Sequence, residues 1–179
     1  LKYFIIYAII DIETTGGKFN EEKITEIAIY RLENDVLTDH LHTLVHSKKE
    51  IQPFVQNLTG INKKMLKNAP KFITISKKIN EITNNCVLVA HNADFDYRML
   101  RNEFKNIGIN YSRKTLCTIE VSKELIPDED SYSLGKLSDS LGIKIKQRHR
   151  ADGDAMATLK LFKMLLNLDN GDNIERFIK

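Results

Sequence analysis

The chain has 179 residues, of which 42% are hydrophobic and 28% charged, and its formal net charge is +3. This length suits one sizeable domain, and this balance excludes an intrinsically disordered chain. Because no apolar run approaches the roughly 18 residues of a membrane span, a transmembrane protein is excluded as well. The two cysteines, Cys86 and Cys117, lie among apolar neighbours. They predict small buried side chains without a disulfide or zinc framework, and hence a reducing, cytoplasmic compartment.

Three strands are predicted first. Residues 3–13 form an apolar run that ends in acids, residues 24–32 follow, and residues 36–46 come after a turn at 33–35. Next, Pro53 begins a short helix that stops at Gly60. Apolar residues at helical spacing predict a helix over residues 70–85, and a short buried strand is expected over residues 86–90.

Strands and helices alternate in the second half of the chain. We predict a helix over residues 93–106, a strand over 115–118, helices over 119–125 and 134–141, and a last helix from Asp152 that buries Leu159 and Phe162. Three strands followed by this alternation indicate an α/β domain with a mixed sheet and helices on its faces. We expect this domain to span residues 1–166 and residues 167–179 to form a polar, frayed tail.

Two acids, Asp11 and Glu13, end the first strand. Alternate residues of a strand point the same way, so these carboxylates share a face, with Cα atoms about 6.5 Å apart. Acids at the end of so apolar a strand are costly unless a cation pairs with them. The turn of residues 14–17 contains two glycines, which allow the backbone to approach a ligand closely. The alternative is a polar strand end whose acids are simply solvated.

Residues 91–96, His-Asn-Ala-Asp-Phe-Asp, follow the predicted buried strand and open a helix. Asp94 occupies the position expected of a helix N-cap. Asp96 lies in the first turn, two residues further on. Periodicity alone leaves open which of these two acids faces the sheet.

Residues 149–154, His-Arg-Ala-Asp-Gly-Asp, precede and open the last helix. An offset of five residues is about 500° on a helix, so His149 and Asp154 would not share a helical face. We therefore expect His149 on the loop that leads into the helix, Asp154 on its first turn, and Asp152 at its N-cap. A single histidine is more often structural than catalytic, but this one lies beside clustered acids.

The three acidic segments and His149 together could form a metal site for phosphoryl chemistry. Hard oxygen ligands without cysteine select Mg²⁺ or Mn²⁺. Two such ions about 4 Å apart can clamp the attacking and leaving oxygens of a phosphoryl displacement. A histidine with an ordinary pKa of about 6.5 can take a proton from the attacking water.

These segments resemble the three exonuclease motifs of the DnaQ-like, DEDDh group, which includes the proofreading epsilon subunit of DNA polymerase III. The motifs stand in the family's order, at residues 11–16, 91–96 and 149–154, and the resemblance spans most of residues 7–166. It implies a ribonuclease-H-like three-layer sandwich with a mixed five-stranded sheet. It also implies that Asp96, rather than Asp94, is the third carboxylate. The implied ligands of two Mg²⁺ or Mn²⁺ ions are Asp11, Glu13, Asp96 and Asp154, with His149 as general base.

The resemblance also implies where the substrate lies. In similar enzymes the stretch that matches residues 58–61 borders the 3′-terminal nucleotide, although Leu58 and Ile61 could equally be core residues. The residues expected to contact substrate are Thr14, Thr15, Leu58, Thr59, His91, Asn92, Phe95 and His149. The basic stretch of residues 144–150 either guides the phosphate backbone or forms a solvated loop.

The implied function is hydrolysis of DNA from a free 3′ end, on a single strand or a frayed primer, with release of nucleoside 5′-monophosphates in proofreading or repair. One alternative is a 3′→5′ exoribonuclease acting on transfer-RNA ends or short RNA, and another is a non-catalytic module that docks on a polymerase. The expected partner is nucleic acid, in the cytoplasm at the nucleoid and away from membranes. A replicative polymerase and a fused repair domain both remain open as further partners, since residues 167–179 contain no convincing clamp-binding motif.

Overall fold

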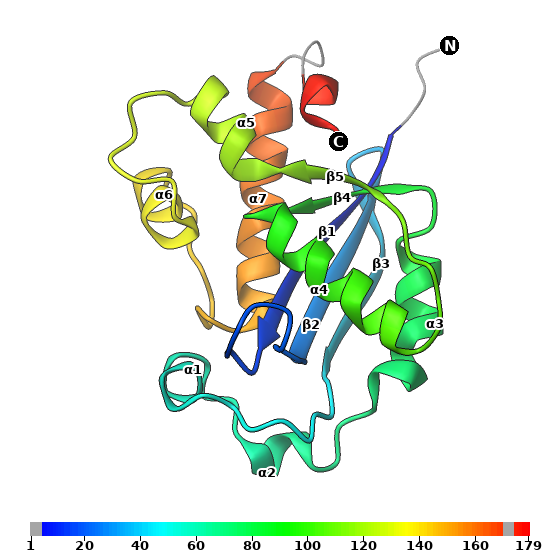
Figure 1. Cartoon of the computed structure of the whole chain (residues 1–179). Coiled ribbons are helices and arrows are strands. Elements are labelled where there is room, and N and C mark those ends of the chain that lie inside the picture. Colours follow the sequence, from blue (N-terminus) through cyan, green and yellow to red (C-terminus); the bar gives the residue numbers. More distant parts are fainter. Residues whose placement is uncertain (1–4, 170–173) are drawn as a thin grey trace.

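The computed structural model describes residues 5–169 and 174–179. Its centre is a five-stranded sheet in the order β3-β2-β1-β4-β5, antiparallel between β1, β2 and β3 and parallel between β1, β4 and β5 (Figure 1). The strands are β1 (Ile6–Thr14), β2 (Ile24–Glu33), β3 (Val36–Leu44), β4 (Cys86–Ala90) and β5 (Lys114–Cys117). This confirms the predicted mixed sheet. Residues 3 and 4 of the predicted first strand lie outside the described residues.

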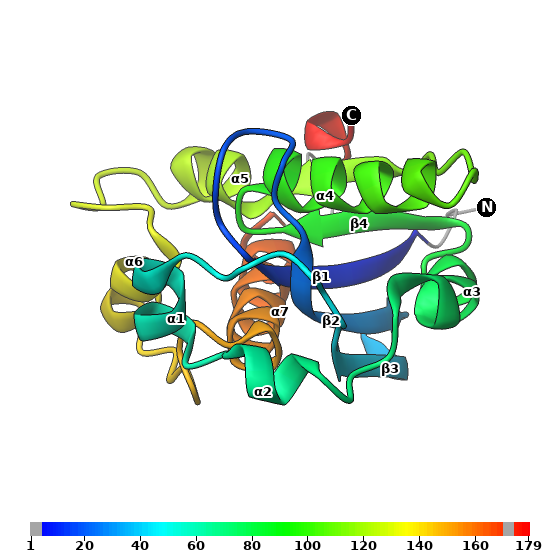
Figure 2. The same cartoon turned by 60° about the horizontal axis from the view of Figure 1, so that its bottom comes forward.

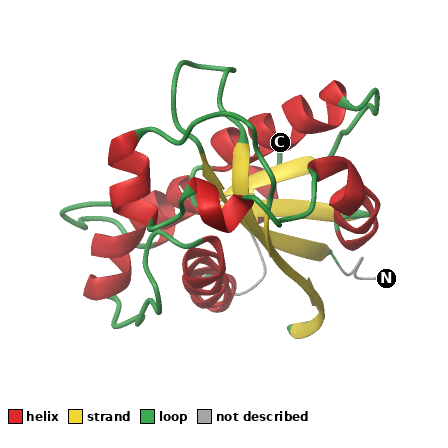
Figure 3. Ribbon diagram, turned by 90° about the horizontal axis from the view of Figure 1, so that it is seen from below, coloured by secondary structure: helices red, strands yellow, loops and turns green. Residues whose placement is uncertain are grey.

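Helices cover both faces of the sheet, so the domain has three layers (Figures 1 and 3). The helices are α1 (Pro53–Thr59), α2 (Lys63–Leu66), α3 (Phe72–Ile82), α4 (Ala93–Asn106), α5 (Thr118–Leu125), α6 (Leu134–Ser140), α7 (Ala151–Leu168) and the 3-10 helix η1 (Ile174–Phe177). Helices α3 and α4 pack on one face, and α5, α6 and α7 pack on the other. None of the helices in the described part of the chain is long and apolar enough to cross a bilayer.

The central strand β1 is apolar on both faces because helices cover both. Its side chains alternate between the two faces. Tyr7 and Ile9 join the core under α7, whereas Ala8 and Ile10 join the core under α3 and α4. The same alternation directs residues 11 and 13 toward the α7 side.

The end of the chain packs against the sheet. The Lys179 amide donates to the Thr115 carbonyl oxygen at 2.9 Å, and the Thr115 amide donates to the Lys179 carbonyl oxygen at 3.0 Å. Ile174 is buried in the core under α7. The prediction of a frayed tail is therefore wrong for residues 174–179, because the edge strand β5 offers unpaired backbone groups that this segment satisfies. Residues 170–173 of that predicted tail lie outside the described residues.

Two short elements, α2 and η1, were not predicted. Each has four residues, which is too short for a helical period to be recognised. The cysteines are both free; Cys86 is buried as predicted, whereas Cys117 is partly exposed.

Candidate active site

Three acidic side chains from two elements meet at one end of the sheet. Asp11 and Glu13 on β1 and Asp154 in the first turn of α7 each place a carboxylate oxygen within 4.8 Å of the others. The two β1 acids share the face that α7 covers, as strand alternation requires. The structure thus brings together three of the four predicted metal ligands.

The fourth predicted ligand, Asp96, approaches from the other side of β1. It is buried in the first turn of α4, and the Ile12 backbone amide bonds to its carboxylate. It lies outside the tight group of three, yet its charge acts on Asp11 more strongly than any other charge does. Asp96 is therefore part of the same acidic cluster.

Burial and mutual repulsion make these acids hard to ionise. Burial and the neighbouring charge of Asp96 raise the pKa of Asp11 well above its ordinary value. Burial, followed by the charge of Asp154, raises the pKa of Glu13 to about 7, and burial also raises the pKa of Asp154. Carboxylates crowded in this way are stabilised as anions by a nearby positive charge or by donated hydrogen bonds.

The site has the features that a bound cation would explain. The Oδ1 atom of Asp154 is buried and has no hydrogen-bond partner among the described residues. A buried carboxylate oxygen without a donor calls for a ligand. Because every group in the cluster is a hard oxygen donor, the residues fit Mg²⁺ or Mn²⁺.

His149 lies on the loop that leads into α7, as predicted. Its backbone has a left-handed conformation, with φ of 60°. Its amide donates to Asp154 Oδ2 at 3.0 Å, and its side chain is partly exposed. The main chain of His149 is thus fixed by the acid cluster, while its imidazole stays accessible beside Asp154.

A buried ion pair, which the sequence analysis did not identify, holds this arrangement together. Glu26 on β2 lies opposite Glu13 in the sheet, and its side chain has no solvent exposure. Arg150 donates to both of its carboxylate oxygens, at 2.7 and 3.0 Å, and the Ala151 amide donates at 3.0 Å. His42 Nε2 lies 2.8 Å from the same carboxylate.

This ion pair ties β2 to the start of α7. Burial alone would raise the pKa of Glu26, but the hydrogen bonds from Arg150 and His42 outweigh burial and lower it. Glu26 is therefore ionised and anchors the segment that carries His149 and Asp154. The available sequence signal was an acid flanked by the isoleucines Ile24 and Ile27 of the strand.

The structure contradicts both predicted N-caps. Helix α4 begins at Ala93, so Asn92, with φ of 87°, occupies the N-cap position and Asp94 lies exposed in the first turn. Helix α7 begins at Ala151, so Asp152 is inside the helix, where it accepts a hydrogen bond from the Tyr30 hydroxyl at 2.6 Å. The predictions were wrong because each helix starts earlier than a capping aspartate would allow.

The threonines predicted to contact substrate form hydrogen bonds within the protein. Thr15 is fully buried, and its hydroxyl accepts from the Lys23 amide at 3.1 Å. The Thr14 hydroxyl accepts from the Gly16 amide, and the Thr59 hydroxyl donates to the Val55 carbonyl oxygen at 2.9 Å. These hydroxyls are committed to internal hydrogen bonds.

Helix α1 borders the acidic cluster through the turn that follows β1. The Gln52 amide donates to the Thr15 carbonyl oxygen at 2.8 Å. A Cβ atom on Gly16 would lie 2.8 Å from Val55 Cγ2, so a glycine is required for this close approach. Of the predicted substrate contacts, Leu58 on α1, Asn92 and Phe95 keep accessible surface.

His91, another predicted substrate contact, is engaged within the protein. Its Nε2 lies 2.7 Å from the Tyr132 carbonyl oxygen and its Nδ1 lies 2.8 Å from the Thr118 hydroxyl. Because a carbonyl only accepts, Nε2 carries the proton and donates it to the Tyr132 carbonyl oxygen. Burial lowers the pKa of His91, which agrees with a neutral ring that joins β4 to the loop before α6.

The basic stretch of residues 144–150 is divided among different surroundings. Arg150 belongs to the buried ion pair with Glu26. The Arg148 guanidinium packs against Gly135 on α6. Lys144 and Lys146 line a separate hollow beside α7. The stretch is therefore not one continuous phosphate-binding surface.

Known exonucleases are similar to this chain in sequence. The sequence model of one family, RNase_T, described as an exonuclease, matches residues 8–162. A relative from Staphylococcus aureus (strain USA300), the 3′-5′ exonuclease DinG, is 38% identical over 156 residues, which are 87% of this chain and 17% of the relative. The chain thus spans about a sixth of the length of the curated relatives that it matches.

Solved structures share the fold. Exonuclease X in complex with 5′ overhanging duplex DNA aligns with a TM-score of 0.76 and 25% identity, over 96% of both chains. The nuclease domain of 3′hExo, a DEDDh family member bound to rAMP, aligns with a TM-score of 0.75 and 18% identity, over 93% of this chain and 94% of that one. These alignments cover the whole ribonuclease-H-like sandwich.

Proposed function

Since the chain belongs to the RNase_T family of exonucleases, we propose that it removes nucleotides one at a time from the free 3′ end of DNA. The observation that supports this most directly is the acidic cluster of Asp11, Glu13 and Asp154, with Asp96 behind it and His149 beside it. The relative from Staphylococcus aureus bears the same 3′-5′ direction in its name.

Each residue of the cluster has a role in this proposal. Asp11, Glu13, Asp96 and Asp154 would hold two Mg²⁺ or Mn²⁺ ions, which would stabilise the charge that develops on the oxygens of a phosphoryl displacement. The His149 imidazole takes a proton from the water that attacks the terminal phosphorus. The bond between that phosphorus and the 3′ oxygen of the preceding nucleotide breaks. A nucleoside 5′-monophosphate leaves, and the new 3′ oxygen takes a proton from solvent.

DNA is the proposed natural substrate, and RNA is the alternative. Exonuclease X, which aligns over nearly the whole chain, was solved with duplex DNA. The 3′hExo nuclease domain was solved with rAMP, a ribonucleotide, and this supports the alternative of an exoribonuclease. Initial rates on DNA and RNA oligomers of the same sequence discriminate between the two, and a faster rate on RNA would favour the alternative.

A 5′-labelled single-stranded DNA oligomer tests the activity. In Mg²⁺ it should shorten progressively from its 3′ end, and chelation of the metal should stop the reaction. Asp11→Asn and Asp154→Asn should each lose about a thousandfold or more, since metal ions contribute several kcal/mol to the barrier. Asp94→Asn is the matched control, because Asp94 is an exposed acid in the first turn of α4. Full activity in the Asp11 or Asp154 variant would reject the metal assignment.

A non-catalytic docking module is the less favoured function. A cluster of carboxylates with raised pKa values opposes folding at neutral pH, and a module that only docks gains nothing from it. Between the two partners left open, a fused domain is favoured over a polymerase, because the matched region is only 17% of the curated relative. A cytoplasmic, nucleoid-associated location remains our prediction for an enzyme of this kind.

A further inference from the structure

Helix α1 presents two large apolar side chains to solvent beside the acidic cluster. Phe54 is 66% exposed and Leu58 is 51% exposed. They are four residues apart and therefore lie on one side of the helix. The adjacent side is fixed, since Val55 and Thr59, each one residue further on, are buried. An exposed aromatic ring next to a nucleotide site is a platform on which a base can stack.

Helix α2 follows α1 (Figure 2) after three residues. A group of lysines lies on and around α2. Five exposed lysines lie around it, with no acidic partner within ion-pair distance in the part of the chain that the structure describes. We call them the lysine patch: Lys48, Lys63, Lys64, Lys67 and Lys71. Four of them line one hollow of about 620 Å³, which adjoins a second hollow that Lys71 lines.

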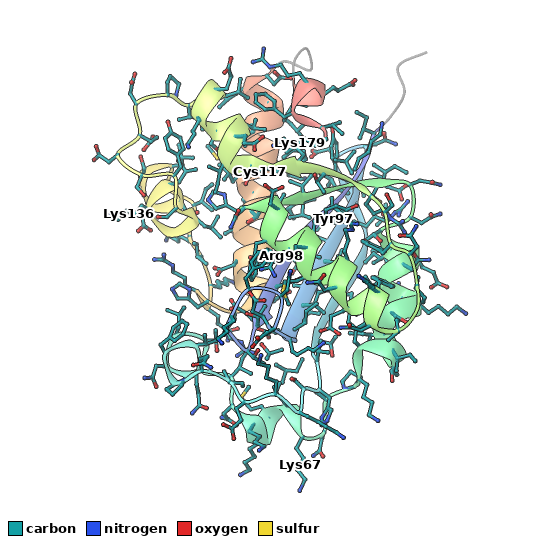
Figure 4. The ribbon with its side chains drawn as sticks, in the orientation of Figure 1. Lys67, Tyr97, Arg98, Cys117, Lys136 and Lys179 are labelled. Carbon is teal, nitrogen blue, oxygen red and sulfur yellow. The ribbon has the colours of Figure 1, made fainter. Side chains whose placement is uncertain are left out.

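The lysine patch rests on a fixed backbone. The His46 amide donates to the Pro70 carbonyl oxygen at 2.8 Å, and His46 Nδ1 lies 2.9 Å from the Leu66 carbonyl oxygen. The Asn62 side chain caps α2 by accepting from the Met65 amide at 3.1 Å. Figure 4 shows Lys67 at the outer end of the molecule, directed into solvent.

The lysine patch differs from the lysines next to it. Lys23 pairs with Glu103 and Lys49 pairs with Glu21. A gathering of like charges without such compensation opposes folding and attracts a polyanion. The patch adjoins α1, and α1 packs on the turn after the β1 acids. A strand whose 3′ end lies at the acidic cluster could therefore continue across α1 to α2.

We propose that the exposed side of α1 and the lysine patch together bind the single strand upstream of the bond that is cut. Bases stack on Phe54 and contact Leu58, and successive phosphates pair with the lysines. This inference rests on the proposed function, since the strand must lead to the carboxylates. Nucleic acid suits this surface better than an acidic protein does, because aromatic and cationic groups lie side by side, as in surfaces that bind single strands.

The test measures binding of single-stranded DNA whose 3′-terminal linkages are phosphorothioates, which resist cleavage, at several salt concentrations. The triple variant K63Q/K64Q/K67Q should weaken binding about tenfold or more at low salt. It should also reduce the slope of log affinity against log salt by about 2, because each phosphate contact on a single strand contributes roughly 0.7. F54A should weaken binding about tenfold without changing that slope, since stacking involves no counterion release.

A second triple variant, K77Q/K114Q/K123Q, is the matched control. It removes the same charge from exposed positions on α3, β5 and α5 and should keep the normal salt slope. Lengthening the oligomer from about 4 to about 12 nucleotides, which stays within the range of single-strand site sizes, should strengthen binding to this control but not to the α2 variant. Thermal unfolding verifies that all variants fold.

Three outcomes would overturn the inference. Equal losses in the two triple variants would mean that only net charge matters. An unchanged salt slope in the α2 variant would mean that its lysines contact no phosphates. Polyglutamate serves as a model of an acidic protein. If the α2 variant lost binding to polyglutamate but bound DNA like the wild type, the lysine patch would be assigned to protein recognition. Failure of the proposed function would look different, because the wild-type protein would then bind DNA with this length dependence yet leave a normal oligomer uncut.

Discussion

At the scale of single residues, the pair of Glu26 and Arg150 does most to hold the site together. Both carboxylate oxygens of Glu26 are used, and none of its side chain reaches solvent. Arg150 is next to His149 and four residues before Asp154. Any movement of Arg150 would therefore move the proposed base and a proposed metal ligand together.

Arg150→Ala should destabilise the protein by about 3–5 kcal/mol, because it leaves Glu26 as a buried charge without its main partner. Urea unfolding measures this change in the free energy of unfolding. The control is Lys163→Ala, which breaks an ion pair with Asp35 at 2.9 Å whose side chains are 35% and 76% exposed. Such a surface pair contributes about 1 kcal/mol at most. Equal losses of stability in the two variants would contradict the role of Arg150 as the main partner of the buried Glu26 carboxylate.

His149→Ala should lower the rate of DNA cleavage by roughly 10²–10⁴-fold, the usual contribution of a general base. Alanine keeps the backbone amide that bonds Asp154, so the variant tests the imidazole alone. Thermal stabilisation by Mg²⁺ should stay close to that of the wild type. A loss of less than about tenfold would remove His149 from the proposed role of base.

At the scale of elements, contact between α7 and the loop before it sets the position of His149. Gly153 lies in the first turn of α7, against the carbonyl oxygens of Lys146 and Gln147. A Cβ atom there would lie only 2.6 Å from the Gln147 oxygen and would also collide with that of Lys146. Only glycine lets this loop pass so close to the helix.

Gly153→Ala should therefore destabilise the protein by roughly 1–3 kcal/mol and lower its activity. In an unobstructed helix the same change would stabilise by about 1 kcal/mol. Gly135→Ala in α6 is the comparison, because the atoms nearest to it belong to the flexible end of the Arg148 side chain, which can move away. Thermal unfolding and a cleavage assay measure both properties, and a Gly153 variant as stable as the wild type would refute this account.

At the scale of the whole molecule, the acidic cluster makes folding depend on pH and metal. The pKa of Glu13 is raised from its ordinary value of 4.5 to about 7 in the folded protein. Below about 4.5 the group is protonated whether or not the chain is folded. Between those values the unfolded chain releases the proton and the folded protein keeps it. The free energy of unfolding therefore falls as pH rises through this window.

In a metal chelator, the Tm should accordingly fall as pH rises from about 4.5 to about 7. Added Mg²⁺ or Mn²⁺ should raise the Tm more at the upper end of this range, because metal binds the ionised carboxylates. Differential scanning calorimetry at several pH values measures both effects. A metal-free Tm that increases across this range, or a metal effect independent of pH, would contradict the assignment.

The sequence by itself determined the features that depend on neighbouring residues. Strand alternation placed Asp11 and Glu13 on one face, and helical spacing located α4 and the inward residues of α7. The resemblance of three short motifs then assigned Asp96 and Asp154 to the same site. Local patterns of this kind survive in the folded protein because they fix the direction of each side chain before any tertiary contact forms.

Only the tertiary structure decided the features that join distant segments. Glu26 and Arg150 are 124 residues apart in sequence, so no periodicity connects them. The predicted caps Asp94 and Asp152 were wrong because α4 begins at Ala93 and α7 begins at Ala151, each before its aspartate. The lysine patch around α2 became visible only when residues 46–48 and 63–71 came together. Packing and long-range ion pairs are properties of the whole fold, which is why they escape a local pattern.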